Sequence, residues 1–259
     1  MLDVHPAHHA ATTWRDFFIH LVTIVIGLLI AVGLEQVVEH FHHNNQVVEV
    51  RRELVDERAE NHERHSINVA YFRRTRAQLR NNLFVLRFLK QHPGTTANAL
   101  PGVISCDQEW AIVMDEVWRG AQQSGILMYM PQPEVQQNGR LYSTLSGAHT
   151  QQGEVSDALM AACQDLATDP DPTHLSPQEL ENTTERMKAV EPKIADWGTY
   201  LVDLHLIFPD FKEVPTPDEL RAFSLSEAER VPALANAAML TRHRLDADAP
   251  DPTARMRAR

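Results

Sequence analysis

Histidine is the residue type of this chain whose placement most strongly suggests chemistry. Seven of the fourteen histidines lie within the first forty-three residues: His5, His8, His9, His20, His40, His42 and His43. His20 is the sharpest case, because it lies in an apolar run, and an ionisable side chain inside a membrane span is a functional candidate by default. Its imidazole could bind a haem iron or a chlorophyll magnesium. A hydrogen bond to another membrane helix and a neutral side chain that reaches the interface are the open alternatives.

Other polar clusters in the sequence fall short of a recognisable catalytic or metal site. Glu39 and His43 share a helical face at i and i+4, but two ligands are too few for a metal without a partner. The run His62-Glu63-Arg64-His65 is one residue short of the zinc-protease spacing His-Glu-x-x-His. The sequence has no nucleophile elbow, no glycine-rich phosphate loop and no zinc signature. We therefore expect a protein that is not an enzyme, with no cofactor other than one at His20.

Cysteine is scarce, with two residues in the chain. This number excludes a small disulfide-stapled domain and any zinc module that needs four cysteines. Cys106 and Cys163 are candidates for a disulfide if this part of the chain is exported to an oxidising compartment. The paired and the reduced states both stay open.

Length and composition bound the architecture. The chain has 259 residues, of which 43% are hydrophobic and 23% charged, so it is long enough for one or two folded domains and is not a disordered chain. A net charge of −11 argues against generic nucleic-acid binding. The charge is uneven, because residues 46–92 have ten Lys and Arg against six acids, whereas residues 93–254 have ten against twenty-five.

An apolar run near the N-terminus predicts a membrane span. Residues Phe17–Leu34 are eighteen residues without a formal charge, which as a helix rise about 27 Å, close to the ~30 Å hydrocarbon core of a bilayer. Val37 and Val38 can extend the span if the intervening acid faces headgroups. Trp14 and Arg15 precede it, where an aromatic anchor and a snorkelling cation are expected.

A cleaved signal peptide is the competing interpretation, because Ala31 and Gly33 provide small residues at a suitable spacing. However, the helical pattern runs on through Glu35 without a turn residue. Arg15 lies on the short side of the span, and no Lys or Arg follows it until Arg51. The positive-inside rule then predicts a cytoplasmic N-terminus and a body outside, in the periplasm of a bacterial cell.

Residues 34–92 contain neither glycine nor proline, and they predict a helical rod of about 90 Å. One seven-residue register along this rod is mostly apolar: Phe41, Val48, Val55, Val69 and Leu83. His62 and Arg76 interrupt this register, so we expect a helix that packs on its own body or on partners rather than a self-sufficient coiled coil. A bend is expected at Asn44-Asn45. The cluster Arg73-Arg74-x-Arg76 predicts a solvated or ion-paired face, with anionic headgroups as the alternative contact.

The remaining chain predicts further helices and no strand of useful length. A loop is expected at 93–102, followed by a helix with apolar positions from Trp110 to Ala121 and a heptad pattern from Leu141 to Leu166. Ser176 begins a capping box for a helix that continues to Phe208, kinked at Pro192, and Thr216-Pro217-Asp218-Glu219 repeats this signature for a shorter last helix. The prediction is an all-α protein with an N-terminal tail at 1–16, a transmembrane helix at 17–38, a helical stalk at 39–92, a helical bundle body at 93–245 and a flexible tail at 246–259.

Two stretches carry a family resemblance. The run IVIGLLIAVGLEQVVEHFHHNNQVVEVRRELVDE, residues Ile24–Glu57, resembles a bacterial family of uncharacterised single-span membrane proteins, and so does Trp118–Tyr142 with its Met128/Met130-Pro131 step. The family pairs an N-terminal Ile-Gly-Leu-Leu-Ile-Ala span with a helical C-terminal body. The resemblance implies an integral membrane protein of bacterial origin, and it implies no catalytic or ligand residue because the family has no known activity.

These observations favour an accessory or structural subunit of a larger inner-membrane complex, photosynthetic or respiratory. Its expected partners are the lipid bilayer and other membrane subunits, which its span would approach through the small residues Gly27, Ala31 and Gly33. The alternatives are a stand-alone membrane-anchored binding or sensor module, alone or as a homo-oligomer, and a cofactor-binding protein that uses His20.

Overall fold

The computed structural model describes residues 14–221, and every regular element in this range is a helix. The predicted all-α class is therefore confirmed. The α-helices are α1 (Trp14–Gln91), α2 (Glu116–Ser124), α3 (Gln132–Ala162), α4 (Pro177–Ile207) and α5 (Pro217–Leu220), which is a single turn. Short 3-10 turns connect them: η1 (Ala97–Ala99), η2 (Ile126–Tyr129), η3 (Gln164–Leu166) and η4 (Pro172–His174). The predictions for 1–13 and for 222–259, which include His5, His8, His9 and the C-terminal tail, lie outside the described residues.

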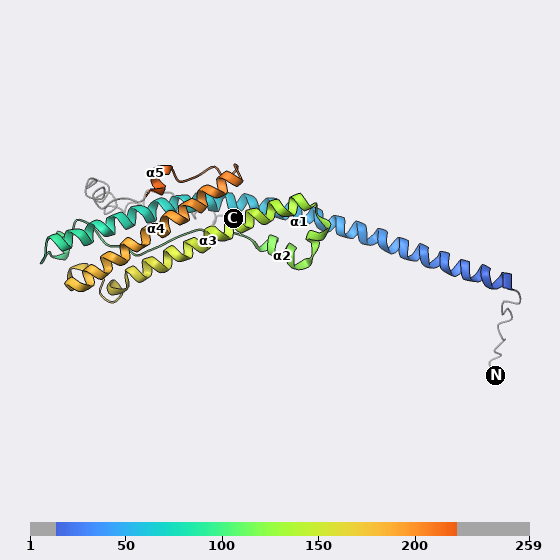
Figure 1. The fold of residues 1–259 in the computed structure, drawn as a ribbon, viewed down its shortest axis with the longest axis horizontal. Helices are drawn as coiled ribbons and strands as arrows, with labels where there is room; N and C mark the ends of the chain where they lie inside the picture. The colour runs from blue at the N-terminus through green and yellow to red at the C-terminus, as the bar shows by residue number, and fades with distance from the viewer. Residues whose placement is uncertain (1–13, 222–259) are drawn as a thin grey trace, which may run out of the picture.

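Helix α1 has 78 residues and is about 117 Å long. It has no internal proline, and it ends before Pro93 and Gly94, whose φ of 80° is a left-handed conformation that glycine adopts without strain. Its C-terminal half is the first helix of the body, and its N-terminal part projects far beyond the body (Figure 1). Most of the predicted stalk, from Val47 onward, is thus part of the bundle. α1 runs through Asn44-Asn45 as one uninterrupted helix, and no break in the helix occurs there.

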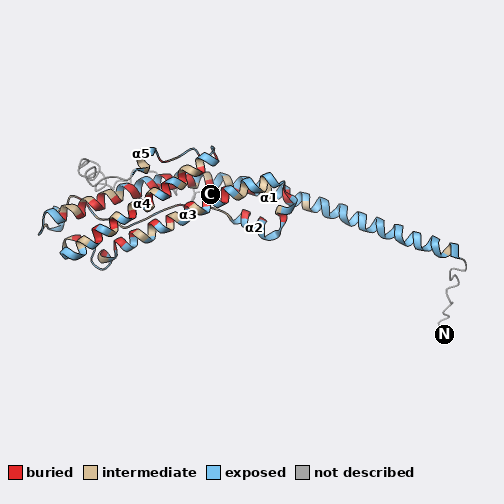
Figure 2. Cartoon of the chain, viewed as in Figure 1, coloured by how far each residue is buried: buried red, intermediate tan, exposed pale blue. Residues whose placement is uncertain are grey.

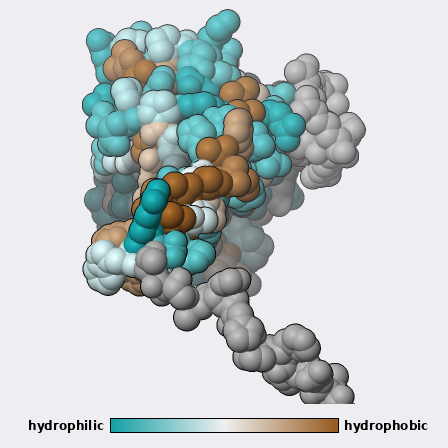
Figure 3. Space-filling view, turned by 90° about the vertical axis from the view of Figure 1, so that its right-hand side faces the viewer, coloured by the Kyte–Doolittle hydropathy of each residue, from teal (hydrophilic) through white to brown (hydrophobic). Residues whose placement is uncertain are grey.

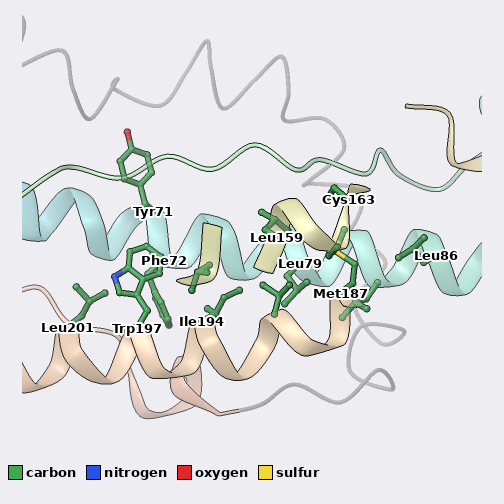
Figure 4. Packing of buried hydrophobic residues seen from close by; sticks show 14 of the residues in the cluster. Tyr71, Phe72, Leu79, Leu86, Leu159, Cys163, Met187, Ile194, Trp197 and Leu201 are labelled. Carbon is green, nitrogen blue, oxygen red and sulfur yellow. The ribbon is translucent and has the colours of Figure 1, made fainter. Parts of the chain in front are cut away.

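The body is a bundle in which α4 packs against both α1 and α3. Its core residues are the apolar positions that repeat at three and four along α4, among them Met187, Ile194 and Trp197, which meet Phe72 and Leu79 of α1 (Figure 4). The rings of Phe72 and Trp197 are 5.8 Å apart in an edge-to-face arrangement, a favoured geometry for aromatic pairs. The periodicity predicted from Leu180 to Phe208 therefore forms the core face.

Helix capping follows the sequence signals. The Ser176 hydroxyl accepts a hydrogen bond from the Glu179 backbone N–H, and the Glu179 carboxylate accepts one from the Ser176 N–H, which completes the predicted capping box. Thr216 makes the same box at the start of α5. Helix α4 continues through Pro192 as one element.

The helix predicted from Trp110 to Ala121 is wrong in its first half. Residues 103–115, which we call the strap, contain no helix, and α2 begins only at Glu116. The strap lies along α1 (Figure 4), and asparagine side chains of α1 form hydrogen bonds with its backbone. These side chains offer the strap backbone partners that compete with the helical hydrogen bonds that its apolar spacing predicts.

Candidate functional site

The N-terminal part of α1 is an exposed apolar rod. Its most apolar eighteen-residue window has a mean hydropathy of 2.7, and none of the window is buried. Figure 2 shows this part of α1 as exposed along its whole length, and Figure 3 shows its apolar surface projecting from a mainly hydrophilic body. A core helix of a soluble protein would be buried in its own fold. Within residues 14–221, α1 is thus long and apolar enough to cross a membrane.

The residues predicted to anchor or pack the span all lie on this exposed part of α1: Trp14, Arg15, His20, Gly27, Ala31 and Gly33. Trp14 and Arg15 belong to the first turn of α1 rather than to the tail, and the Trp14 ring stacks on Phe17 at 5.5 Å. A Cβ added at Gly27 or Gly33 would meet no atom within 4 Å. The fold therefore leaves these positions accessible to other membrane helices.

His20 lies on the exposed surface of α1. No group of three or more His, Cys, Asp or Glu side chains within 14–221 is placed to hold a metal ion. A haem or chlorophyll at His20 would thus take its other contacts from outside the described chain, and it stays a prediction. His43, by contrast, has a packing contact, because its ring stacks on Tyr129 with centroids 3.9 Å apart.

The contact of His43 with Tyr129 marks where the body begins. Val47, one turn after His43, is the first buried residue of α1. Met128, which precedes Tyr129 in η2, has 78% of its surface exposed. His43 follows the end of the predicted span at residue 38 by about 7.5 Å of helix rise. The η2 turn is therefore the part of the body nearest to the expected membrane surface.

Basic side chains of α1 pair with acidic side chains of the body. Five such ion pairs join distant segments: Arg51–Glu134 at 2.7 Å, Arg58–Asp210 at 2.8 Å, Arg73–Glu219 at 2.7 Å, Arg74–Glu109 at 3.1 Å, and Lys90–Glu181. Partly exposed pairs of this kind contribute about 0–1 kcal/mol each, so they set the alignment of α1 more than its stability. Arg76 donates to the backbone carbonyls of Asp218 and Arg221. The opposite charges of the two segments therefore pair within the chain, in agreement with the ion-paired face predicted for the Arg73-Arg74-x-Arg76 cluster.

A ladder of asparagines on α1 holds the strap. The side-chain amide of Asn68 donates to the carbonyl of Ala111 at 2.9 Å and accepts from its N–H at 2.8 Å. Asn61 makes the same two bonds with Met114, both at 2.8 Å. Asn82 makes them with Ser105, at 2.6 and 3.1 Å. Each amide thus takes the place of a neighbouring β-strand by satisfying both polar groups of one strap residue.

The spacing of the asparagine ladder matches a helix to an extended chain. Asn61 and Asn68 are seven residues apart, or about 10.5 Å along a helix. Their strap partners are three residues apart, which spans about 10 Å in extended backbone. The fourteen residues from Asn68 to Asn82, about 21 Å, likewise match six strap residues at about 20 Å. This ladder was not predicted from the sequence, although asparagine recurs at multiples of seven residues on a helix without glycine or proline.

Cys106 and Cys163 are joined by a disulfide, with their Cα atoms 6.2 Å apart. Cys106 lies in the strap and Cys163 follows the last turn of α3. The strap is therefore tied to α1 by the asparagine ladder and to α3 by a covalent bond. Of the two cysteine states that the sequence left open, the structure contains the paired one.

Buried ionisable side chains serve packing. The Tyr142 hydroxyl donates to Glu57 at 2.6 Å, and the other carboxylate oxygen of Glu57 accepts from the Val117 N–H at 2.8 Å. Burial raises the pKa of Tyr142, and the Glu57 hydrogen bond raises it further. The His65 ring donates to the Glu213 carbonyl at 2.6 Å, while burial lowers the pKa of His65.

An open depression on α3, lined by residues that include Arg140, Ser143 and Thr144, offers neutral hydroxyls and one cation. These groups are suited to solvent or to weak polar contact, because none of the lining residues is a general base.

No family model, curated protein or solved structure matches this chain.

Proposed function

We propose that this protein is a non-enzymatic, single-pass membrane subunit that packs against and stabilises a larger membrane protein complex. The observation that carries the proposal is α1 itself, one unbroken helix of 78 residues that is bare and apolar at its start and a core element of the body at its end. Membrane anchor and body are thus joined without a flexible linker. Such a rod transmits position and orientation, which is what a structural subunit needs.

The use of the polar side chains supports this proposal. The basic groups of α1 pair with the body, Glu57 and His65 hold backbone and side-chain partners, and the asparagine ladder satisfies the strap. These side chains, which could otherwise act as acids, bases or ligands, are thus engaged in structural contacts. The exposed apolar surface of α1 and the exposed Met128 at the membrane-proximal turn are suited to lipid and protein contact.

The disulfide supports the proposed topology. Disulfides form and persist in oxidising compartments, such as the bacterial periplasm, and are rare in the cytosol. A body that carries the Cys106–Cys163 bond is therefore proposed to lie outside the inner membrane of a bacterial cell, with the N-terminus in the cytoplasm. This orientation agrees with the position of Arg15 on the short side of the span.

Purification from native membranes in mild detergent tests the proposal. Migration at a fixed stoichiometry with a complex of other subunits is expected. Gly33→Leu should weaken this association, because a large side chain would fill space that α1 leaves open for another helix. Leu29→Ile is the matched control, since it changes only the shape of an exposed apolar side chain. Purification of the chain by itself, or with copies of itself alone, would refute a host complex.

A further inference from the structure

The exposed part of α1 carries an apolar stripe with a seven-residue repeat. Leu34, Phe41, Val48 and Val55 follow one another at this spacing, and each has between 55% and 66% of its surface exposed. A second row precedes each member by three residues: Ala31, Val38, Asn45 and Arg52, with Ala59 continuing it. The alternating spacing of three and four is the a/d pattern of a coiled coil, and it extends over about four heptads. In this notation the first row occupies d positions and the second row a positions.

The body occupies the opposite face of α1. Val47, Leu54 and Asn61 are buried against it, and at about 100° per residue their side of the helix is roughly 130° from the centre of the apolar stripe. The a and d positions from Ala31 to Ala59 are all exposed. A second helix can therefore lie along the stripe while the body stays packed on the other side.

We propose that two copies of this chain associate through α1 as a parallel two-stranded coiled coil over residues 31–59. The seam begins inside the apolar span and continues about 30 Å beyond its predicted end at residue 38. The inference rests on the membrane insertion of α1 that the proposed function includes, and it requires no host complex.

Polar residues in the seam favour this partner over another. Asn45 occupies an a position, and a single asparagine there fixes register and favours two parallel strands at a cost in stability. In a two-fold dimer its amide meets the same amide of the second copy, so each can donate and accept. Arg52, at the next a position, is followed at the flanking e position by Asp56, a carboxylate that can offset its charge.

The charges beside the seam are also self-complementary. In a parallel dimer a residue at position g faces the e position five residues farther along the other helix. Arg51 then faces Asp56 of the second copy, and Arg58 faces Glu63 of the second copy. Both pairs are of opposite sign, and both arginines already lie at the edge of the body through their bonds to other acids. The same surface therefore fits a rotated copy of itself.

The membrane removes the alternative orientation. Because every copy inserts in the same direction and to the same depth, an antiparallel arrangement is excluded and the register is restricted before contact. Gly27 lies one heptad before Leu34 on the same stripe, so the helices can approach closely within the bilayer. Beyond Ala59 the next d and a positions are His62 and Ser66, and these polar residues end the seam.

Disulfide crosslinking in native membranes tests this dimer. The two native cysteines are bonded to each other, so one introduced cysteine provides the reactive thiol. Val48→Cys and Val55→Cys, at d positions, are expected to give a product of two chains on mild oxidation. Glu53→Cys is the matched control, because it is equally accessible on the same helix but lies off the seam. Co-expression of two differently tagged copies shows that both halves of the product are this chain.

The double variant Val48→Asp/Val55→Asp provides the second measurement. We expect the number of copies of this chain per particle in mild detergent to fall from two to one, while the body stays folded because both side chains are exposed. Crosslinking no greater at Val48 and Val55 than at Glu53, or products formed only with other polypeptides, would overturn the dimer. Migration with other subunits but without these crosslinks would overturn the dimer and leave the proposed function standing.

Discussion

Asn68 gives the most direct test of how the strap is held. The side chain is 3% exposed, and its amide is the partner of both the N–H and the carbonyl of Ala111. Asn68→Ala removes both bonds and leaves two backbone groups without partners in a buried place. Each such group costs about 1–3 kcal/mol. Because Asn61 and Asn82 still hold the strap on either side, we expect a loss in the lower half of the summed range, about 3 kcal/mol of unfolding free energy.

The assay is thermal and urea unfolding of the full chain in detergent, followed by tryptophan fluorescence. Trp118 and Trp197 are buried, one in each of the two apolar clusters of the core, so their fluorescence reports on both clusters. A loss of about 3 kcal/mol corresponds to a fall of about 6–12 °C in Tm for a chain of this size. Asn44→Ala, at an exposed asparagine of the same helix, is the control and should change stability by less than about 0.5 kcal/mol. Equal effects of Asn68→Ala and Asn44→Ala would refute the account of the ladder.

Three further predictions follow from burial, covalent linkage and titration. Gly198→Ala should lower stability by about 1–3 kcal/mol because its Cβ would lie 2.6 Å from side-chain atoms of the core, whereas Gly153→Ala has open space and should raise stability by about 1 kcal/mol. Reduction of the Cys106–Cys163 disulfide should cost about 4 kcal/mol, since the bond closes a loop between residues 57 apart. His65 has a pKa below its ordinary value of 6.5 because burial disfavours its charged form. As the pH falls below 6.5, the unfolded chain therefore binds a proton at His65 before the folded chain does. The free energy of unfolding should for this reason be independent of His65 above about pH 6.5 and decrease below it.

Each of these has a control. Equal effects of the two alanine substitutions in thermal unfolding would contradict the close packing at Gly198. Cys163→Ala should make stability insensitive to reductant, and a remaining sensitivity would show that the effect lies elsewhere. His65→Gln keeps a donor for the Glu213 carbonyl and should reduce the loss of unfolding free energy below pH 6.5. An unchanged decline in urea unfolding of this variant would assign the pH dependence to another group.

Signals that act between neighbouring residues could be predicted from the sequence. The capping box at Ser176, the α4 core face and the long helix without glycine or proline each depend on contacts within a few residues. The apolar span is of the same kind, because its composition alone determines its hydropathy. The paired state of Cys106 and Cys163 could only be left open, since it requires two segments 57 residues apart to meet.

The apolar register of α1 shows why a seven-residue pattern was ambiguous. An α-helix drifts by about 20° per heptad relative to a perfect seven-residue repeat. Val55 is 66% exposed, whereas Val69 and Leu83 on the same register are 0% and 2% exposed. The drift carries the register from the free face of α1 to the face that packs on α4. One sequence pattern therefore serves two surfaces, an exposed stripe before Ala59 and a core beyond it.

The sequence by itself determined the helices, their caps and the exposed apolar beginning of the chain, because periodicity, capping and hydropathy are local properties. Only the tertiary structure decided that residues 103–115 form a strap instead of a helix. The apolar spacing from Trp110 onward predicted a helix, but the amides of Asn61 and Asn68 offer the strap backbone partners that only the folded chain brings within reach. Tertiary packing likewise decided which face of α1 the body covers and which face stays exposed.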